Sequence, residues 1–246
     1  ERTYTYDGRE RMTGFSDGTA TWTYGYDARA WRVSKTNGTV TYRYFRDGRT
    51  LEEYQVTGGV TPSYSLLKQY LFRQDGFTPW LMCDDDECRY VFTDHLGTPI
   101  RVFDEDGVMA WAATLKPFGE EVAGSEAGID QPVRFPGQWK DGESGEYYNW
   151  WRYYRWSVGR YSSLDLKLMD AFGDFMGTVV GDLSWNGYIY ANSNSLMAID
   201  ASGYYPAWVV WSAGVVLVTY VGNLIGSIAK AINDSDASGF VTIHWV

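Results

Sequence analysis

The sequence has few of the residues from which histidine-based metal sites and nucleic-acid-binding surfaces are built. Only His95 and His244 are histidines among its 246 residues, whereas a histidine-ligated metal ion needs several such side chains in one place. Acidic residues outnumber basic ones by 31 to 21, and the net charge of -10 repels a phosphate backbone. We therefore expect no metal, no other cofactor and no nucleic-acid partner. For His95 we expect a hydrogen-bonded structural role.

No signal peptide is visible in the first residues of the sequence. Glu1 leads directly into strand-like sequence, without the positively charged and apolar regions of a signal peptide, so none is expected here. The length allows one large all-β unit or one domain followed by a tail.

Cysteine is equally scarce, with two residues in the whole chain. Cys83 and Cys88 flank the acidic stretch DDDE, between the strand-like runs PWLM and RYVFTD, so they are expected to face each other across a hairpin. A disulfide and a pair of free thiols both fit this placement. The acidic stretch lacks the glycine and the ligand spacing of an EF-hand loop, which argues against a calcium site.

Aromatic residues and glycines, in contrast, are abundant. The chain has 20 Tyr, 12 Trp and 27 Gly, a mixture that favours many short strands joined by tight turns. In residues 20–26 the aromatic side chains alternate with threonines, which is the two-residue period of a strand. We expect this aromatic face to be packed, with Trp22 largely buried. A carbohydrate-binding platform is the alternative for these aromatic rings.

A repeat of 20 residues runs through the first part of the chain. Tyrosine recurs at Tyr4, Tyr24 and Tyr44, and aspartate recurs at the same interval. The repeat predicts a hairpin unit of about 20 residues. Asp-Gly or Asn-Gly pairs separate the strand-like runs, where glycine can supply a positive φ; they lie at 7–8, 17–18, 37–38, 47–48, 75–76 and 106–107.

Three stretches carry a resemblance to a known family. YTYDGRERMTGFSDGTATWTYGYDARAWRVSK resembles tandem YD repeats of the Rhs proteins, and VFTDHLGTPIRVFDEDGVMAWAATLKPFGE resembles their DHLGTP segment. RFPGQWKDGESGEYYNWWRYYRWSVGRYSSLD is similar to the segment that opens the Rhs-associated core. The matches follow the family order over residues 1 to about 203, and the remaining residues match no named segment.

The resemblance implies an all-β fold in which YD hairpins form a spiral antiparallel sheet, a cocoon-like shell closed by a plug from the Rhs core. It implies shell strands over 1–130, the core over 131–204 and a variable cargo segment over 205–246. The C-terminal tail is expected to be hydrophobic, with helix as one option for it. Helix elsewhere is expected only in short pieces of the insertion around LMDAFGDFMGTVVGD, residues 168–182.

The resemblance also implies a cleavage site. In the family, aspartates of two DPxG-type motifs act with an arginine of the RYY stretch to cut the chain beyond the second motif. By position these residues are Arg152, Asp165 and Asp200, and the cut would fall between Tyr204 and Tyr205. Two close carboxylates can divide the roles of general base and general acid.

The motifs depart from the family pattern in this chain. The first reads DLKL and the second DASG, and Asp170 begins a further DAFG that could replace the one at Asp165. In the alternative interpretation these aspartates only cap or stabilise turns, in a core that does not cleave.

The residues from 207 to 229 carry no charge. This stretch is long enough for a membrane helix, and Gly222 and Gly226 form a GxxxG pair. In the family context, the same residues begin the cargo and could stay buried in a shell until delivery. Insertion into a target-cell membrane and sequestration are both compatible with the sequence.

Three functions remain open at this point. The first is an Rhs shell that encloses a C-terminal toxin and cuts it free, the second a non-catalytic structural or adhesive YD-repeat shell, and the third a glycan-binding secreted β protein. The expected partners are the chain's own C-terminal toxin segment and secretion or toxin-complex machinery, or an upstream shell. The expected location is extracellular or inside a target cell after delivery.

Overall fold

The structure is a computed structural model that describes residues 1–84, 87–122, 128–165, 186–203, 207–212 and 215–219; over 207–219 it describes the backbone only. The described residues form three antiparallel sheets and one short 3-10 helix, η1 (Ala191–Ser193). The fold is all-β, as the sequence predicted.

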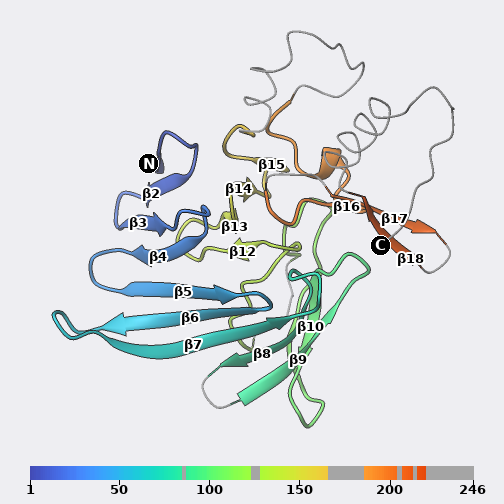
Figure 1. The fold of residues 1–246 in the computed structure, drawn as a ribbon, viewed down its shortest axis with the longest axis horizontal. Coiled ribbons are helices and arrows are strands. Elements are labelled where there is room, and N and C mark those ends of the chain that lie inside the picture. The colour runs from blue at the N-terminus through green and yellow to red at the C-terminus, as the bar shows by residue number, and fades with distance from the viewer. Residues whose placement is uncertain (85–86, 123–127, 166–185, 204–206, 213–214, 220–246) are drawn as a thin grey trace, which may run out of the picture.

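The largest sheet has 11 strands, and each strand pairs with the next one along the chain. Its order is a simple meander that bends around one side of the four-stranded sheet (Figure 1). The strands are β1 (Thr3–Tyr6), β2 (Met12–Ser16), β3 (Thr21–Tyr26), β4 (Arg32–Thr36), β5 (Thr41–Asp47), β6 (Thr50–Thr57), β7 (Ser63–Phe72), β8 (Pro79–Asp84), β9 (Glu87–Thr93), β10 (Pro99–Phe103) and β11 (Met109–Ala112).

The 20-residue repeat corresponds to one hairpin, because β1 with β2, β3 with β4 and β5 with β6 each fill one period. Five of the six predicted Gly pairs lie between strands, and in the pair at 47–48 Asp47 is the last residue of β5. The predicted positive φ is present at five of these glycines but absent at Gly8. In the longer turn after β1, the residue in the left-handed conformation is Glu10, at φ 59°. In the equivalent turn after β3, it is Ala30, at φ 65°.

The aromatic face of the first strands packs on the four-stranded sheet. Tyr24 is buried and lies 5.9 Å from the ring of Tyr153. Trp22 points to the same face but is only half-buried, stacked on Tyr42 at 6.3 Å. The predicted register is therefore correct and the predicted burial of Trp22 is incomplete, because Trp22 lies beside an open pocket rather than under the second sheet.

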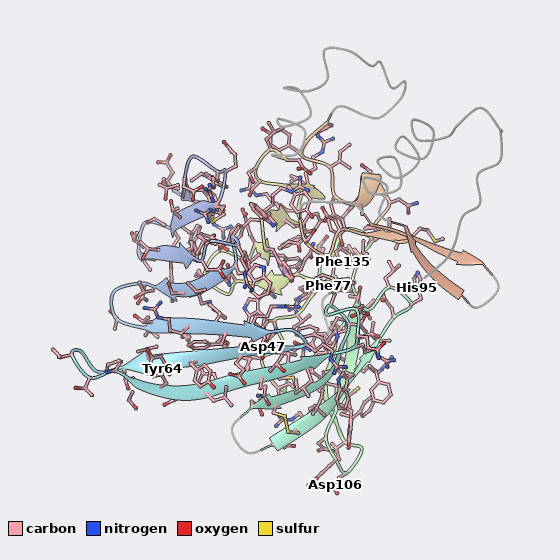
Figure 2. The ribbon with its side chains drawn as sticks, in the orientation of Figure 1. Asp47, Tyr64, Phe77, His95, Asp106 and Phe135 are labelled. Atoms are coloured by element: carbon pink, nitrogen blue, oxygen red, sulfur yellow. A yellow bond between two sulfur atoms is a disulfide. The ribbon has the colours of Figure 1, made fainter. Side chains whose placement is uncertain are left out.

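The four-stranded sheet comprises β12 (Trp139–Lys140), β13 (Tyr147–Asn149), β14 (Arg152–Arg155) and β15 (Arg160–Tyr161). Its aromatic residues form a core with Phe135 and with the segment around η1. On the other side it meets the large sheet, where Trp139 lies 5.9 Å from Tyr44 and 5.7 Å from Tyr70. Side chains from both sheets project into the space between them (Figure 2).

The third sheet joins β16 (Ala198–Ile199) to β17 (Ala207–Ser212) and β18 (Val215–Thr219). The described part of the uncharged stretch is thus a hairpin, and the helix considered for it is not found there. Its many valines explain this, because β-branched side chains favour strands. No helix in the described residues has the length and apolar character needed to cross a membrane.

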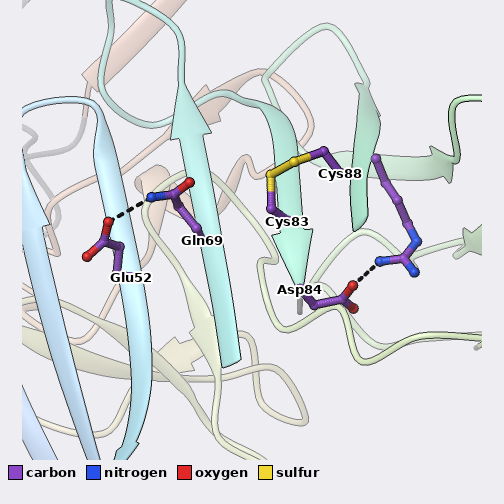
Figure 3. Close-up of a disulfide and its surroundings, with 6 residues drawn as sticks. Glu52, Gln69, Cys83, Asp84 and Cys88 are labelled. Atoms are coloured by element: carbon purple, nitrogen blue, oxygen red, sulfur yellow. Dashed lines mark hydrogen bonds and ion pairs between the residues drawn. A yellow bond between two sulfur atoms is a disulfide. The ribbon is translucent and has the colours of Figure 1, made fainter. Parts of the chain in front are cut away.

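Cys83 and Cys88 are directly paired residues of β8 and β9, and they form a disulfide (Figure 3). Their Cα atoms lie 4.1 Å apart. Next to the disulfide, Arg89 forms ion pairs with Asp84 and Glu87. Of the two alternatives for the cysteines, the structure contains the disulfide.

Candidate functional site

Arg152, at the start of β14, is the centre of a buried polar cluster. Its Nη2 atom lies 3.0 Å from Oδ2 of Asp165 and 3.0 Å from Oδ2 of Asp200. Its other nitrogens donate to the carbonyl oxygens of Gly187 and Gly203. The structure thus brings together three residues that the sequence separates widely. Their catalytic roles remain predictions.

Asp200 has an unusual environment for a carboxylate. It is 1% exposed, and its Oδ2 accepts hydrogen bonds from Arg152 and, at 2.8 Å, from the Tyr161 hydroxyl. Its Oδ1 makes no hydrogen bond of normal geometry to the described residues. Burial raises the pKa of Asp200 to about 6, against the opposing effects of Arg152, Tyr161 and the Gly203 N–H; Asp165 adds to the rise. A carboxyl group with such a pKa can bind or release a proton near neutral pH.

Two further side chains hold this carboxylate, and the sequence analysis missed both. Tyr161 donates to Asp200, and its ring lies 3.6 Å under the guanidinium of Arg152. Asn149 donates from Nδ2 to the Tyr161 hydroxyl at 2.8 Å and to the Asp200 carbonyl at 2.7 Å. The sequence pointed to both residues, because they lie in the stretch that resembles the start of the Rhs-associated core, Asn149 in YYN (147–149) and Tyr161 in GRY (159–161).

Glycines allow the DASG segment to lie against these strands. A Cβ atom at Gly137 would be 1.8 Å from the carbonyl oxygen of Ala201, and one at Gly203 would be 2.2 Å from that of Asn149. Gly203 also has φ +67°, which disfavours any other residue. The glycines of the RFPGQ and DASG elements therefore let the backbone of residues 200–203 approach the site closely.

The remaining predicted residues are placed as follows. Asp170, Tyr204 and Tyr205 lie outside the described residues. Within the described residues, no group of three or more His, Cys, Asp or Glu side chains could hold a metal ion. The His95 ring nitrogen Nε2 lies 3.0 Å from the carbonyl oxygen of Leu196, in a hydrogen bond.

The geometry is suited to acid–base chemistry on a nearby carbonyl group. Two carboxylates share one guanidinium nitrogen, and one of them is buried with a raised pKa. Arg152 also holds the Gly203 carbonyl, so the chain that leads to residue 204 is fixed by the same cation. Such a pair can keep one carboxyl protonated while the other is ionised.

Comparisons with known proteins agree with this fold. The family model described as RHS protein matches residues 89–122. The toxin protein Tse5 of Pseudomonas aeruginosa is 38% identical over 119 residues, which are 48% of this chain and 8% of Tse5. The double-stranded DNA deaminase toxin A of Burkholderia cenocepacia is 40% identical over 77 residues, 30% of this chain and 5% of that toxin. The chain thus spans a small part of the length of these relatives.

Solved structures with the same fold come from toxin complexes. The Tc holotoxin pore of Photorhabdus luminescens matches with a TM-score of 0.55 and 18% identity, over 89% of this chain and 11% of the matched chain. TcdB2-TccC3 without its hypervariable C-terminal region matches with a TM-score of 0.57 and 18% identity, over 82% and 10%. The family match and these relatives support a fragment of an Rhs or YD-repeat protein, and the toxin-complex structures share its all-β fold.

Proposed function

We propose that this chain is part of an Rhs shell that encloses its own C-terminal segment and cuts the chain between Tyr204 and Tyr205. The observation that carries the proposal is the position of Arg152. Its guanidinium contacts the carboxylates of Asp165 and Asp200 and the carbonyl of Gly203, one residue before the predicted cleavage position.

The proposed reaction is hydrolysis of one peptide bond. One carboxylate removes a proton from water, whose oxygen attacks the carbonyl carbon of Tyr204. The other carboxyl group donates a proton to the carbonyl oxygen, and Arg152 stabilises the negative charge that develops nearby. When the C–N bond breaks, the carboxyl group that took the proton from water gives it to the nitrogen of Tyr205, which leaves as an amine. The hydroxyl formed from the carbonyl oxygen returns its proton to the other carboxylate as the new C-terminal acid forms. Asp200, with its pKa raised to about 6, suits the role of the proton donor.

Enclosure of the cargo is supported by the curvature of the large sheet and by the strand pairing after the site. The sheet bends around the four-stranded sheet (Figure 1). Residues 198–199 pair with residues 207–208, on either side of the predicted cut. A cut chain would therefore stay assembled until unfolding, as a shell that carries its cargo to a target cell requires. Secretion or toxin-complex machinery would deliver it.

Intact-mass measurement under denaturing conditions tests the proposal. The full chain should give two fragments that meet between residues 204 and 205, and the two should elute together in native size-exclusion chromatography. Asp200→Asn should give one uncut chain with an unchanged elution volume. Asp106→Asn, in an exposed turn, is the matched control and should be cut like the wild type.

Continued cutting of Asp200→Asn would reject the aspartyl mechanism. If the wild-type chain is not cut, the remaining hypothesis is a non-catalytic shell in which Asp200 only stabilises the DASG turn.

A further inference from the structure

A cavity of about 230 Å³ lies between the large sheet and the four-stranded sheet, apart from the Asp200 cluster. Its walls come from the turn before β4, the end of β5, the loop between β7 and β8, and the residues around Trp139 and Trp150. Phe77, on the β7–β8 loop, lies between the two sheets in Figure 2. An engineered apolar cavity of about 150 Å³ is large enough to bind benzene. The space here thus suffices for one aromatic ring and a small polar group.

Aromatic rings form one side of the cavity. Trp150 lies 5.1 Å from Trp31 and 5.3 Å from Phe77. Trp150 has φ 54°, a conformation that bulky residues rarely adopt and that costs on the order of 1–3 kcal/mol. The fold therefore holds this ring in the cavity wall despite an unfavourable backbone conformation.

Arg46 adds a positive charge that no acidic residue among those described neutralises. Its guanidinium lies 4.6 Å from the Trp150 ring and 5.0 Å from the Phe72 ring, and it donates to the carbonyl of Gly76. None of the ion pairs found within the described ranges involves Arg46. Burial lowers the pKa of Arg46 to about 10, with Tyr148 opposing the shift.

Gln138 supplies a second polar group to the same cavity. Its side chain is almost completely buried, at 1% exposure, and lines the cavity. Neither its amide nitrogen nor its amide oxygen has a hydrogen-bond partner among the described residues. A buried amide without partners is costly, and a ligand with polar atoms would remove that cost.

The charge of the cavity favours an anion, although the chain as a whole has a net charge of -10. Asp27 is the only acidic residue of the described lining, and its Oδ1 already accepts the backbone N–H groups of Arg29 and Trp31. Arg29 is exposed and also lines the cavity, and like Arg46 it forms no ion pair with a described residue. Arg32 lines the cavity too, but it is paired with Asp141.

We propose that this cavity binds a small aromatic carboxylate. The carboxylate would pair with the Arg46 guanidinium, and the Gln138 amide would donate to a carboxylate oxygen. The ring would pack against the wall formed by Trp31 and Trp150, which contact each other edge to face. Charge-assisted hydrogen bonds to a carboxylate are stronger than neutral ones, so the charge of the ligand decides the affinity.

Calorimetric titration of the full chain with phenylacetate and with its neutral isostere phenylacetamide tests this site. Phenylacetate should bind at least about tenfold more tightly, a ratio typical of one charge-assisted hydrogen bond. Arg46→Gln should remove this preference and leave the weak binding of the amide unchanged. Arg43→Gln, an exposed arginine on the same strand, is the matched control and should bind like the wild type.

A second variant keeps the test valid if Arg46→Gln does not fold. Gln138→Met preserves the size of the side chain and should weaken phenylacetate binding about tenfold, with an unchanged circular dichroism spectrum. No binding of phenylacetate at about 10 mM, which corresponds to less than about 3 kcal/mol of binding free energy, would overturn the proposal. Equal affinities for the acid and the amide, or an equal loss in Arg43→Gln, would do so as well.

Discussion

Two buried arginines, Arg32 and Arg152, each contact an aspartate and at least one tyrosine, yet their aspartates differ. Arg32 pairs with Asp141 through two nitrogens, and the two carboxylate oxygens lie 2.5 and 2.8 Å from them. Arg152 reaches Asp200 through one nitrogen, which it shares with Asp165. Both oxygens of Asp141 are paired, whereas Oδ1 of Asp200 has no partner of normal geometry among the described residues.

The difference separates an ion pair in which both carboxylate oxygens are paired from one in which a carboxylate oxygen has no partner among the described residues. Asp141 precedes β13, and Arg32 begins β4, so their pair joins the four-stranded sheet to the large sheet. A bidentate pair of this kind fixes the geometry of both side chains. At Asp200, incomplete pairing and burial leave a carboxyl group that can take up a proton near neutral pH.

Asp141→Asn should have the largest effect on stability. It removes one partner of a fully buried pair and leaves the Arg32 cation without its counter-ion, which typically costs about 3–5 kcal/mol. Urea unfolding at pH 7 measures the loss, and Asp106→Asn, an exposed turn residue, should change the free energy of unfolding by less than about 0.5 kcal/mol. A loss below about 1 kcal/mol in Asp141→Asn would show that this pair does not hold the sheets together.

Asp200→Asn should instead increase the free energy of unfolding at pH 7. The folded-state pKa of about 6 exceeds the ordinary 3.8, so the folded protein binds more protons than the unfolded chain between these pH values. Ionisation of Asp200 therefore costs stability as the pH rises through that window, and above pH 6 the cost is about 3 kcal/mol. In uncut chains, Asp200→Asn should be more stable than the wild type by up to about this amount at pH 7 and equally stable near pH 4.

Urea unfolding across this pH range measures the difference, and carboxyl carbon-13 NMR locates the midpoint of Asp200 directly. If Asp200→Asn is less stable than the wild type at pH 7, Asp200 is a structural partner of Arg152, as Asp141 is of Arg32.

Tyr161→Phe should have a smaller effect that sharpens the comparison. Its hydroxyl donates to the ionised form of Asp200, and a hydrogen bond to a charged group contributes about 1.5 kcal/mol. Its loss should raise the pKa of Asp200 by about one unit in the same NMR titration. Tyr153→Phe, the matching tyrosine at Arg32, should leave that pKa unchanged. A midpoint that moves equally in both variants would indicate a general disturbance of the fold.

The sequence alone determined the hairpins, their turns and the packed face of the first strands. These features depend on contacts between residues close together in the chain. The alternation that points Trp22 and Tyr24 to one face is set by the geometry of a single strand, and an Asp-Gly or Asn-Gly pair specifies a turn over a few residues. The order of the strands in the large sheet is their order in the sequence, because each hairpin pairs with the next one along the chain.

Tertiary structure decided how much each residue is covered and which distant groups meet. Tyr24 lies under the four-stranded sheet and Trp22 does not, although their strand positions are equivalent. Arg152 and Asp200 were expected to meet through family resemblance, but the contacts of Asn149 and Tyr161 appeared only in the folded chain. Such contacts depend on the curvature of one sheet and the placement of another, which no local pattern encodes.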